Sequence, residues 1–530
     1  MTDENSVPDA SRSNSFIDEK AEKASVEYIY GDLKNLDVGL ELVAGVDEHA
    51  EFSPQEAKRL RRKLDWHLLP MLCLIYTGMG ALLSNRVSFT DLGKFILGYT
   101  SIFVYSWLSY GQQFVDKSIQ HFELGILYWS LFLGLHAVCH NFGSLFALRF
   151  LLGASEGSMT AGLMLVCSMF YTRTEIGERL GWTFQCNGLA VIISGFLQFG
   201  VAHADANKHP NQWQWLMIAT SLITFVPFVL FLFFFPDNPT TARFLTPRER
   251  LHAVRRVREN QNGIETKTWK RYQVIEALKD PKTWLFALFG GFGALLGGIG
   301  VQYSILIKSY GFTTLQTTLL SIPSGFAQII GITSACYALR RFPNSRAWIS
   351  IIGWIPAILA CLLELCVPFS NRNAHLVFIG FYLPLSSDLG SSPAFIMTMS
   401  WVTSTVSGHT KKTTTTAIFL VGYALGQILC TQFWLEKYRP INRVPWGITL
   451  MSHLCAILCA LALRWVFVRE NARRDLLQAE AEKTGKNLSA FEEFAYVETT
   501  DKDGNTIQTR VSKAYLDLTD KENLAFRYVL

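Results

Sequence analysis

The pattern of hydrophobic and polar positions divides the chain into long apolar blocks separated by polar stretches. Blocks such as "LLPMLCLIYTGMGALLS", "LITFVPFVLFLFFF" and "AILCALALRWVFV" have about the length that a helix needs to cross a hydrocarbon core about 30 Å thick. A surface helix of a soluble protein would carry one apolar stripe, whereas these segments are apolar most of the way round. The pattern therefore predicts a polytopic α-helical membrane protein.

Twelve spans are expected, in two groups of six on either side of a long polar interval. Their expected positions are 67–85, 94–113, 124–140, 144–168, 181–201 and 213–235, then 284–305, 316–338, 348–367, 376–400, 413–434 and 446–467. Two groups of this kind are typical of two pseudo-symmetric halves with a site between them at mid-membrane. The predicted fold class is all-α, with twelve transmembrane helices in two six-helix bundles.

The polar stretches complete the predicted domain organisation. We expect a disordered cytoplasmic tail, a first bundle, a cytoplasmic linker, a second bundle and a cytoplasmic C-terminal tail, at 1–62, 63–236, 237–283, 284–468 and 469–530. Within the linker, "TPRERLHAVRRVRENQ" has helical spacing, with Leu251, Val254 and Val257 on one side. This spacing predicts a surface helix under the bundle.

The distribution of Lys and Arg predicts the orientation. Basic loops such as "KRLRRKLDW", "YTRTEIGER" and "RRFPNSR" all fall on one side of a twelve-span arrangement. Cytoplasmic loops carry an excess of these residues, so both termini are expected in the cytoplasm. The loop "EKYRPINR", with Lys437, Arg439 and Arg443, is the exception on the opposite side.

Composition supports the membrane interpretation and narrows the function. Half of the residues are hydrophobic and 17% are charged, whereas a soluble surface needs about a quarter. The ten cysteines lie in apolar blocks without a CxxC pair, so we expect packed thiols and no metal site. The chain lacks GxSxG, P-loop and HExxH motifs, which argues against an enzyme and against ATP-driven pumping. A secondary transporter without a cofactor, and without a nucleic-acid partner, fits best.

The fourth span, "LALRFLLGASEGSMTAG", carries the densest candidate site. Arg149 and Glu156 are seven residues apart, which places them on one helix face about 10 Å apart. Charges inside a span are costly, so we interpret Arg149 as an attractor for an anionic substrate and Glu156 as a protonatable partner. A structural ion pair remains the alternative. Gly153 and Gly157 have a spacing that lets another helix approach closely.

Other polar residues at membrane depth are weaker candidates. Asp388 lies in the broken stretch "SSDLGSSP" of the tenth span, and Arg86 closes the first span, where a gating or a snorkelling role is possible. Several polar side chains would line a cavity or, individually, hydrogen-bond between helices: Gln185, Asn187, Gln302, Tyr303, Gln328 and Gln427. His136 and His140, one turn apart in the third span, are interpreted as packing or interfacial residues.

Several stretches resemble a known family. "RFLLGASEG", "FFPDNPTTARFLTPRER", "GFTTLQTTLLSIPSG", "SGHTKKTTTTAI" and "DLTDKENLAFRYVL" together extend over nearly the whole chain. They resemble the major facilitator superfamily, and within it the fungal anion:cation symporter group typified by allantoate permease. The resemblance implies alternating access around a central site and proton-coupled uptake of a small organic anion, such as allantoate, ureidosuccinate or a vitamin carboxylate. A monomer in the plasma membrane is expected.

The first half departs from the family pattern in two places. "LLSNRVSF" has Asn85 where relatives commonly have an acid, and "GQQFVDKSIQHFE" lacks the usual Pro and glycine-plus-basic turn, although Asp116 keeps an acidic charge there. Both departures bear on proton coupling and on the conformational latch. An efflux carrier and a non-transporting nutrient receptor on the same fold therefore stay open as alternatives.

Overall fold

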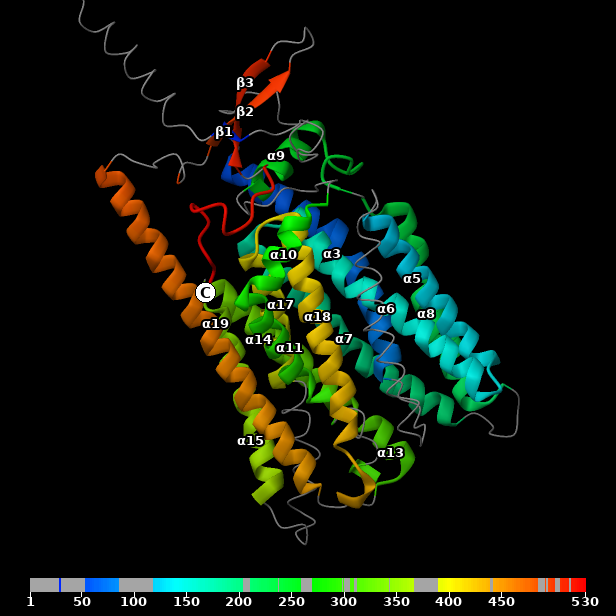
Figure 1. Ribbon diagram of the computed structural model, residues 1–530. Helices are drawn as coiled ribbons and strands as arrows, with labels where there is room; N and C mark the ends of the chain where they lie inside the picture. Colours follow the sequence, from blue (N-terminus) through cyan, green and yellow to red (C-terminus); the bar gives the residue numbers. More distant parts are fainter. Residues whose placement is uncertain are drawn as a thin grey trace, which may run out of the picture.

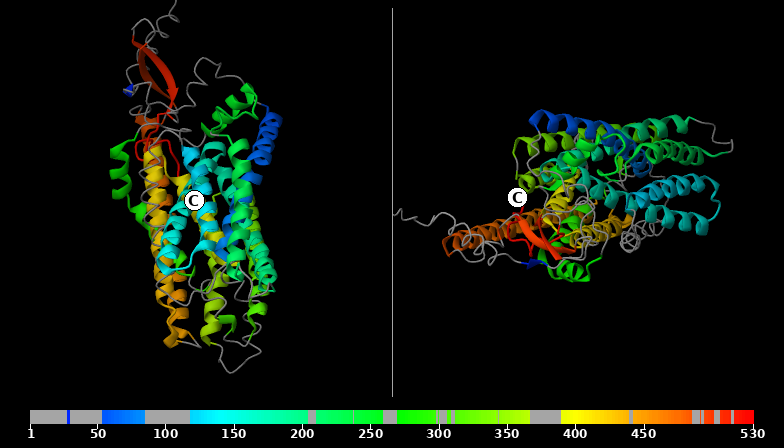
Figure 2. Two further views of the ribbon diagram at one scale, coloured as in Figure 1. Left: turned by 90° about the vertical axis from the view of Figure 1, so that its right-hand side faces the viewer. Right: turned by 90° about the horizontal axis from the view of Figure 1, so that it is seen from above.

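A computed structural model describes the chain at 28–29, 53–84, 118–203, 210–236, 238–258, 269–297, 299, 306–308, 312–342, 344–366, 389–438, 442–484, 491, 494–500, 506–513 and 516–530. Its helices run side by side as an elongated bundle, with a small sheet at one end (Figures 1 and 2). Six of these helices are long and apolar enough to cross a membrane. The predicted membrane fold is confirmed.

The first group of helices begins earlier than the first predicted span. It contains α3 (Pro54–Ser84), α5 (Ser118–Leu135) with the short η2 (His136–Val138), α6 (Phe142–Phe170), α7 (Arg173–Ala202) and α8 (Gln212–Phe234). The Ser53 hydroxyl accepts a bond from the Glu56 N–H at 3.2 Å, and the Glu56 carboxylate accepts one from Ser53 N at 3.0 Å. This capping box starts α3 within the segment 1–62, which was predicted to be a disordered tail. The last nine residues of that segment (54–62) are therefore helical.

The second group contains α11 (Pro281–Ala294), α13 (Thr314–Leu319), α14 (Ile322–Arg341), α15 (Arg346–Cys366), α17 (Ser391–Thr405), α18 (His409–Gln432), η5 (Glu436–Tyr438) and α19 (Arg443–Thr484). Here α11 packs on α18 and α19, and α15 packs on α17 and α19. The described helices cover all or part of every predicted span except 94–113, which lies outside the described residues. The last span continues well beyond its predicted end.

Helices α7 and α14 join the two groups along most of their length. A Cβ atom on Gly188 would lie 2.7 Å from the carbonyl oxygen of Gly325, and one on Gly325 would lie 2.5 Å from that of Gly188. Nearer the ends of the same contact, Gly181 faces Cys336 and Gly195 faces Ile322. Glycines at these positions let the two backbones touch, as small residues do in membrane helix pairs.

Two linker helices lie at one end of the bundle. In α9 (Pro247–Arg258), Leu251, Val254 and Val257 are buried, as the helical spacing predicted. The Lys63 ammonium donates to Glu249 at 2.7 Å, and Arg256 pairs with Glu175, so α9 is tied to α3 and α7. The second linker helix, α10 (Arg271–Lys279), packs instead on α18 and α11.

A small sheet at the same end was not predicted by the hydrophobic pattern. Its strands are β1 (Tyr28–Ile29), β2 (Phe494–Thr500) and β3 (Thr506–Ser512), in the order β1-β2-β3. β1 is parallel to β2, and β2 is antiparallel to β3. The N-terminal and C-terminal segments therefore meet above the helices (Figure 1).

Candidate functional site

A row of aromatic rings crosses from one group of helices to the other. Tyr76 on α3 lies 5.1 Å from Phe184 on α7, and Phe184 meets Phe395 on α17 edge-to-face at 6.2 Å. Phe395 in turn lies 4.7 Å from Tyr423 on α18, all distances being between ring centroids. We call Tyr76, Phe184, Phe395 and Tyr423 the aromatic bridge. Its four rings come from four helices and cross the boundary between the two groups of helices.

The predicted glutamines surround this bridge but do not form one cluster. Gln185 on α7 donates to Thr333 on α14 at 2.9 Å, a bond between the two groups of helices. Gln328 on α14 donates to Ser392 at 3.1 Å, just within α17. Both bonds fit the interpretation of these amides as links between helices.

Gln427 is the predicted polar residue that adjoins the bridge directly. Its amide donates to the Tyr423 hydroxyl at 3.0 Å, one turn away on α18. A Cβ on Gly297 would meet the Gln427 oxygen at 2.1 Å, so the amide packs against the chain that follows α11. Gln427 therefore orients one ring of the bridge.

Asn187 is a different kind of candidate. Its Oδ1 atom is buried on α7 and has no hydrogen-bond partner among the residues that the structure describes. A buried acceptor without a partner is costly, by about 1–3 kcal/mol. An atom of this kind, three residues from Phe184, is suited to accept a bond from a ligand.

Arg149 lies in the first half of α6. It is half-buried and comes seven residues after the first residue of the helix, about 10 Å along the axis. Its charge acts on His136, the first residue of η2, which was predicted to be a packing or interfacial residue. The His136 ring nitrogen Nδ1 is 2.6 Å from the Phe132 carbonyl oxygen, and its Nε2 has no partner within the described part of the chain. The spacing of His136 and His140 was the signal that could have identified this neighbour of Arg149.

Several predicted residues are only partly described or lie outside the described residues. Gly153 is buried within α6, and Glu156 and Gly157 lie on the same helix, but the surroundings of those two are not described. The remaining predicted positions outside the described residues are Arg86, Asp116, Gln302, Tyr303 and Asp388. The roles assigned to all of these residues stay predictions.

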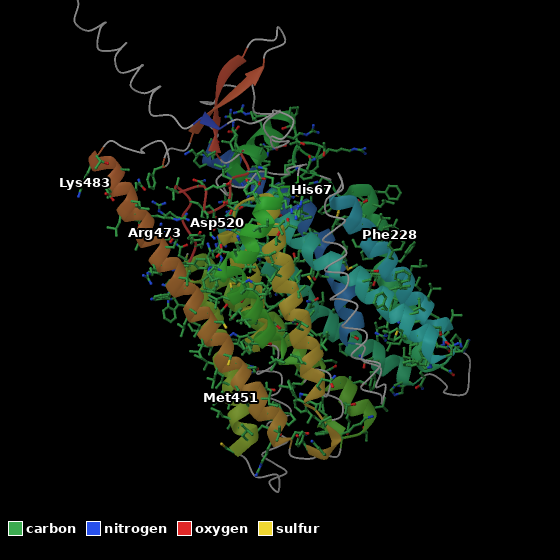
Figure 3. All side chains as sticks on the ribbon, in the orientation of Figure 1. His67, Phe228, Met451, Arg473, Lys483 and Asp520 are labelled. Carbon is green, nitrogen blue, oxygen red and sulfur yellow. The ribbon has the colours of Figure 1, made fainter. Side chains whose placement is uncertain are left out.

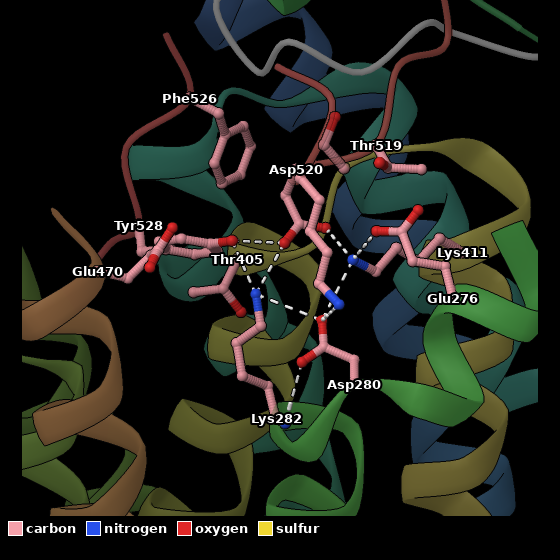
Figure 4. A network of polar contacts seen from close by, with 12 residues as sticks. Glu276, Asp280, Lys282, Thr405, Lys411, Glu470, Thr519, Asp520, Phe526 and Tyr528 are labelled. Carbon is pink, nitrogen blue, oxygen red and sulfur yellow. Dashed lines mark hydrogen bonds and ion pairs between the residues drawn. The ribbon is translucent and has the colours of Figure 1, made fainter. Parts of the chain in front are cut away.

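The residues of the best-defined polar cluster were not among the predicted site residues. Residues 516–530, which we call the docked tail, fold back onto the end of the second group of helices (Figure 4). The Asp520 carboxylate accepts bonds from Lys411 at 2.6 Å, from Lys282 at 2.8 Å and from the Tyr528 hydroxyl at 2.5 Å. Lys411 also contacts Glu276 and Asp280.

Backbone contacts hold the rest of the docked tail in place. Arg474 on α19 donates to the carbonyl oxygens of Asp520 at 2.7 Å, Phe526 at 2.7 Å and Asn523 at 3.3 Å. Trp401 on α17 donates to the Val529 carbonyl oxygen at 2.8 Å. Burial alone would raise the pKa of the Asp520 carboxyl, but Lys282 and Lys411 hold it well below its usual range. The tail is thus an integral part of the fold.

Comparison with known proteins decides the family. The family described as Major Facilitator Superfamily matches residues 122–431. The chain belongs to the major facilitator superfamily. An uncharacterised transporter of Schizosaccharomyces pombe is 31% identical over 90% of this chain and 85% of its own length.

Other relatives place this superfamily member in the allantoate permease-like group of fungal transporters. The allantoate permease of Saccharomyces cerevisiae is 29% identical over 91% of this chain and 88% of its own length. The thiamine pathway transporter of the same yeast is 28% identical, with 92% and 90% covered. These relatives are transporters, and the chain is a transporter, not an enzyme.

A solved structure supports the fold independently. The proton:xylose symporter XylE shares 11% of its residues with this transporter and superimposes with a TM-score of 0.58, covering 78% of this chain and 96% of its own. At that identity the likeness concerns the fold alone. The predicted fold and family are therefore both confirmed, and the transporter carries a small molecule across a membrane.

Proposed function

We propose that the protein takes up a small organic anion together with protons by alternating access. The observation that carries the proposal is Arg149, a half-buried cation in the first half of the apolar helix α6. A cation inside a span is costly and by default marks a substrate or ion pathway. An arginine fork matches a carboxylate in shape as well as in charge.

The aromatic bridge and Asn187 support a flat, polar substrate. Stacked and edge-to-face rings bind planar groups, and the Asn187 oxygen accepts a bond from an N–H donor. A ureide carboxylate offers a planar amide, N–H donors and one negative charge. The similarity to allantoate permease favours the same class, although another relative is a high-affinity cysteine transporter.

The driving force and location belong to the same proposal. We expect an imposed proton gradient to drive uptake, with no cofactor and with the protein acting as a monomer in the plasma membrane. We expect both termini in the cytoplasm, and the Lys and Arg residues of α9, α10 and the docked tail support this orientation.

A substrate screen with matched variants tests this proposal. Cells that express the full chain are given labelled small carboxylates and ureides, with and without a protonophore. At equal surface abundance, Arg149→Gln should reduce uptake by about tenfold or more, the loss expected from one charge-assisted contact. Arg149→Lys should retain part of it, and Arg340→Gln, at an exposed position near the end of α14, should transport normally.

Each part of the proposal has its own contrary outcome. Wild-type uptake by Arg149→Gln would remove the substrate role of the arginine. Uptake that ignores the protonophore would exclude proton coupling. Net flux only outward, measured in vesicles of both orientations, would identify an efflux carrier, and binding without flux would identify a receptor.

A further inference from the structure

Two arginines and two tryptophans form a strip on the outer surface of α15 and α19. The Arg464 guanidinium lies 5.2 Å from the ring centre of Trp348, and that of Arg469 lies 5.3 Å from the ring centre of Trp465. Trp348 is 47% exposed and Trp465 is 61% exposed. We call these four residues the arginine–tryptophan strip. The two helices that carry it lie side by side (Figure 1).

The strip is the end of two apolar tracks. On α15, Trp348 continues into the exposed residues Ile352, Ile355 and Leu359, which share one face of the helix. On α19, Trp465 continues into an equivalent exposed face formed by Met451, Leu454, Leu458 and Leu461. Both tracks are apolar surfaces that suit contact with lipid acyl chains. Both end at a tryptophan, a residue that is enriched at the membrane interface.

The Arg464 guanidinium carries a hydrogen-bond donor without an acceptor among the described residues. It lies inside the predicted span 446–467, and its Nη1 atom is buried without a hydrogen-bond partner among the described residues. An arginine near the end of a span reaches toward the headgroup layer. What this guanidinium lacks is an acceptor, and a negatively charged one is favoured.

The neighbouring acids do not supply that acceptor. Glu470 contacts Arg474 at 3.1 Å and Arg473 at 3.4 Å, and Asp475 contacts Arg527 at 2.9 Å. The strip therefore keeps its positive charge. Arg469 lies one helical turn before Arg473, which Figure 3 labels, and Trp348 lies two residues after Arg346, whose N–H donates to the Leu530 carbonyl oxygen of the docked tail. The strip is therefore near the end of the molecule that is proposed to face the cytoplasm. The cytoplasmic leaflet is the one that carries anionic lipids.

We propose that the arginine–tryptophan strip binds the headgroup of an anionic phospholipid. The lipid phosphate accepts a hydrogen bond from the half-buried Arg464 guanidinium beside Trp348, while the exposed Arg469, five residues further on and about 140° round α19, adds positive charge at the headgroup layer. Its acyl chains run along the exposed tracks of α15 and α19. Binding requires no movement of the two groups of helices and is independent of the transported substrate.

Lipid retention by the purified full-length protein tests the proposal. The protein is placed in nanodiscs of phosphatidylcholine, with or without phosphatidylserine, and the retained lipids are counted by native mass spectrometry. Wild type should retain phosphatidylserine in preference, and Arg464→Gln should lower its retention about tenfold. Arg464→Lys should be intermediate, because an ammonium is a point charge without the planar fork.

Two controls separate this site from general charge and from folding defects. Arg473→Gln removes an exposed cation that already pairs with Glu470, and it should retain phosphatidylserine like wild type. Thermal unfolding in phosphatidylcholine alone shows whether each variant is folded. If Arg464→Gln does not fold, Trp348→Ala provides the test, since loss of the stacked ring should also weaken retention.

The source of the phosphate is decided in the same experiment. Inorganic phosphate or soluble glycerophosphoserine is added to phosphatidylcholine discs, and thermal unfolding is compared with that in phosphatidylserine discs. Stabilisation by phosphatidylserine alone supports a lipid site. Equal stabilisation by the soluble anions, or unchanged phosphatidylserine retention in a folded Arg464→Gln protein, would overturn the proposal.

Discussion

Phe395 is the residue through which most of the aromatic bridge is connected. Its ring contacts Phe184 across the two groups of helices, and Tyr423 and Phe419 within the second group. Since it is only half-buried, its side chain is also available to a ligand that enters between the groups. A single ring therefore combines a structural contact with a candidate substrate surface.

We predict that Phe395→Ala lowers substrate affinity more than protein abundance. One stacking contact between the Phe395 ring and a planar substrate, worth about 0.5–1.5 kcal/mol, corresponds to a rise of about twofold to tenfold in KM for uptake. Phe395→Tyr keeps the ring and should transport nearly normally. Phe326→Ala, at an exposed position on α14, is the matched control. An unchanged KM in Phe395→Ala would place the substrate elsewhere.

Asp520 is the residue on which the docked tail depends. Its carboxylate neutralises Lys282 and Lys411, which are both largely shielded from solvent. Removing one partner of a buried ion pair costs about 3–5 kcal/mol when the other charge is left alone, and less here because Asp280 still contacts both lysines. Asp520→Asn should therefore lower the thermal stability of the purified protein and expose the tail to protease.

A second aspartate provides the control for this prediction. Asp475 pairs with Arg527 at 2.9 Å, but its side chain is 66% exposed. An exposed pair of this kind is worth about 0–1 kcal/mol, so Asp475→Asn should leave the unfolding temperature nearly unchanged. Equal effects of the two substitutions would show that burial of the Asp520 cluster does not matter.

At the scale of elements, the contact between α7 and α14 depends on Gly188 and Gly325. Each glycine faces the carbonyl oxygen of the other at a distance that a side chain does not tolerate. Gly188→Val should push the helices apart and strongly reduce uptake, with a smaller loss of surface abundance. Gly143→Val is the comparison, because a Cβ there meets no atom within 4 Å. Normal uptake by Gly188→Val would show that close contact is dispensable.

The same scale shows how far the sequence predicts the fold. Long apolar blocks locate the described spans, and the buried stripe of α9 follows from helical spacing alone. The start of α3 was missed because the Ser53–Glu56 capping box lies in a polar stretch that the hydrophobic pattern does not register.

The site was less predictable than the helices. The docked tail pairs Asp520 with Lys282, 238 residues away, and no local pattern reports such a contact. The aromatic bridge escaped attention because 38 phenylalanines are spread over the apolar blocks. Arg149 was identified because a charge within an apolar span is rare, and its neighbour His136 was not, because histidine is less costly there.

At the scale of the whole molecule, each group of helices has its own polar collar at the tail-bearing end. Ion pairs of α9 connect Glu249 to Lys63 and Arg256 to Glu175, within the first group. Ion pairs of α10 and the docked tail connect Glu276 and Asp520 to Lys411, within the second group. Within the described part of the chain these ion pairs do not cross-link the two groups, which leaves α7, α14 and the aromatic bridge as contacts that can change while each group moves as a unit.

The ion pairs in the polar collar of the second group form over a defined pH range. Burial disfavours the charged form of Lys411, but Asp520 and Asp280 raise its pKa overall, whereas the pKa of Asp520 is lowered. The stabilisation that the Asp520 carboxylate contributes is present above its unfolded pKa of about 3.9 and is lost as the pH falls below that value. The stabilisation that the Lys411 ammonium contributes is present below its unfolded pKa of about 10.4 and is lost as the pH rises above the raised pKa of the folded protein. The docked tail should therefore stay bound from about pH 4 to about pH 10.

Protease sensitivity of the docked tail measures this range directly. In wild type, cleavage within residues 516–530 should be constant between about pH 5 and pH 8 and increase only below about pH 4. Asp520→Asn has no carboxyl to protonate, so it should be cleaved faster at neutral pH and change little on acidification. A rise in wild-type cleavage between about pH 7 and pH 5 would mean that a histidine controls docking. His409, whose backbone N–H donates to the Asp517 carboxylate, would be the residue to test next.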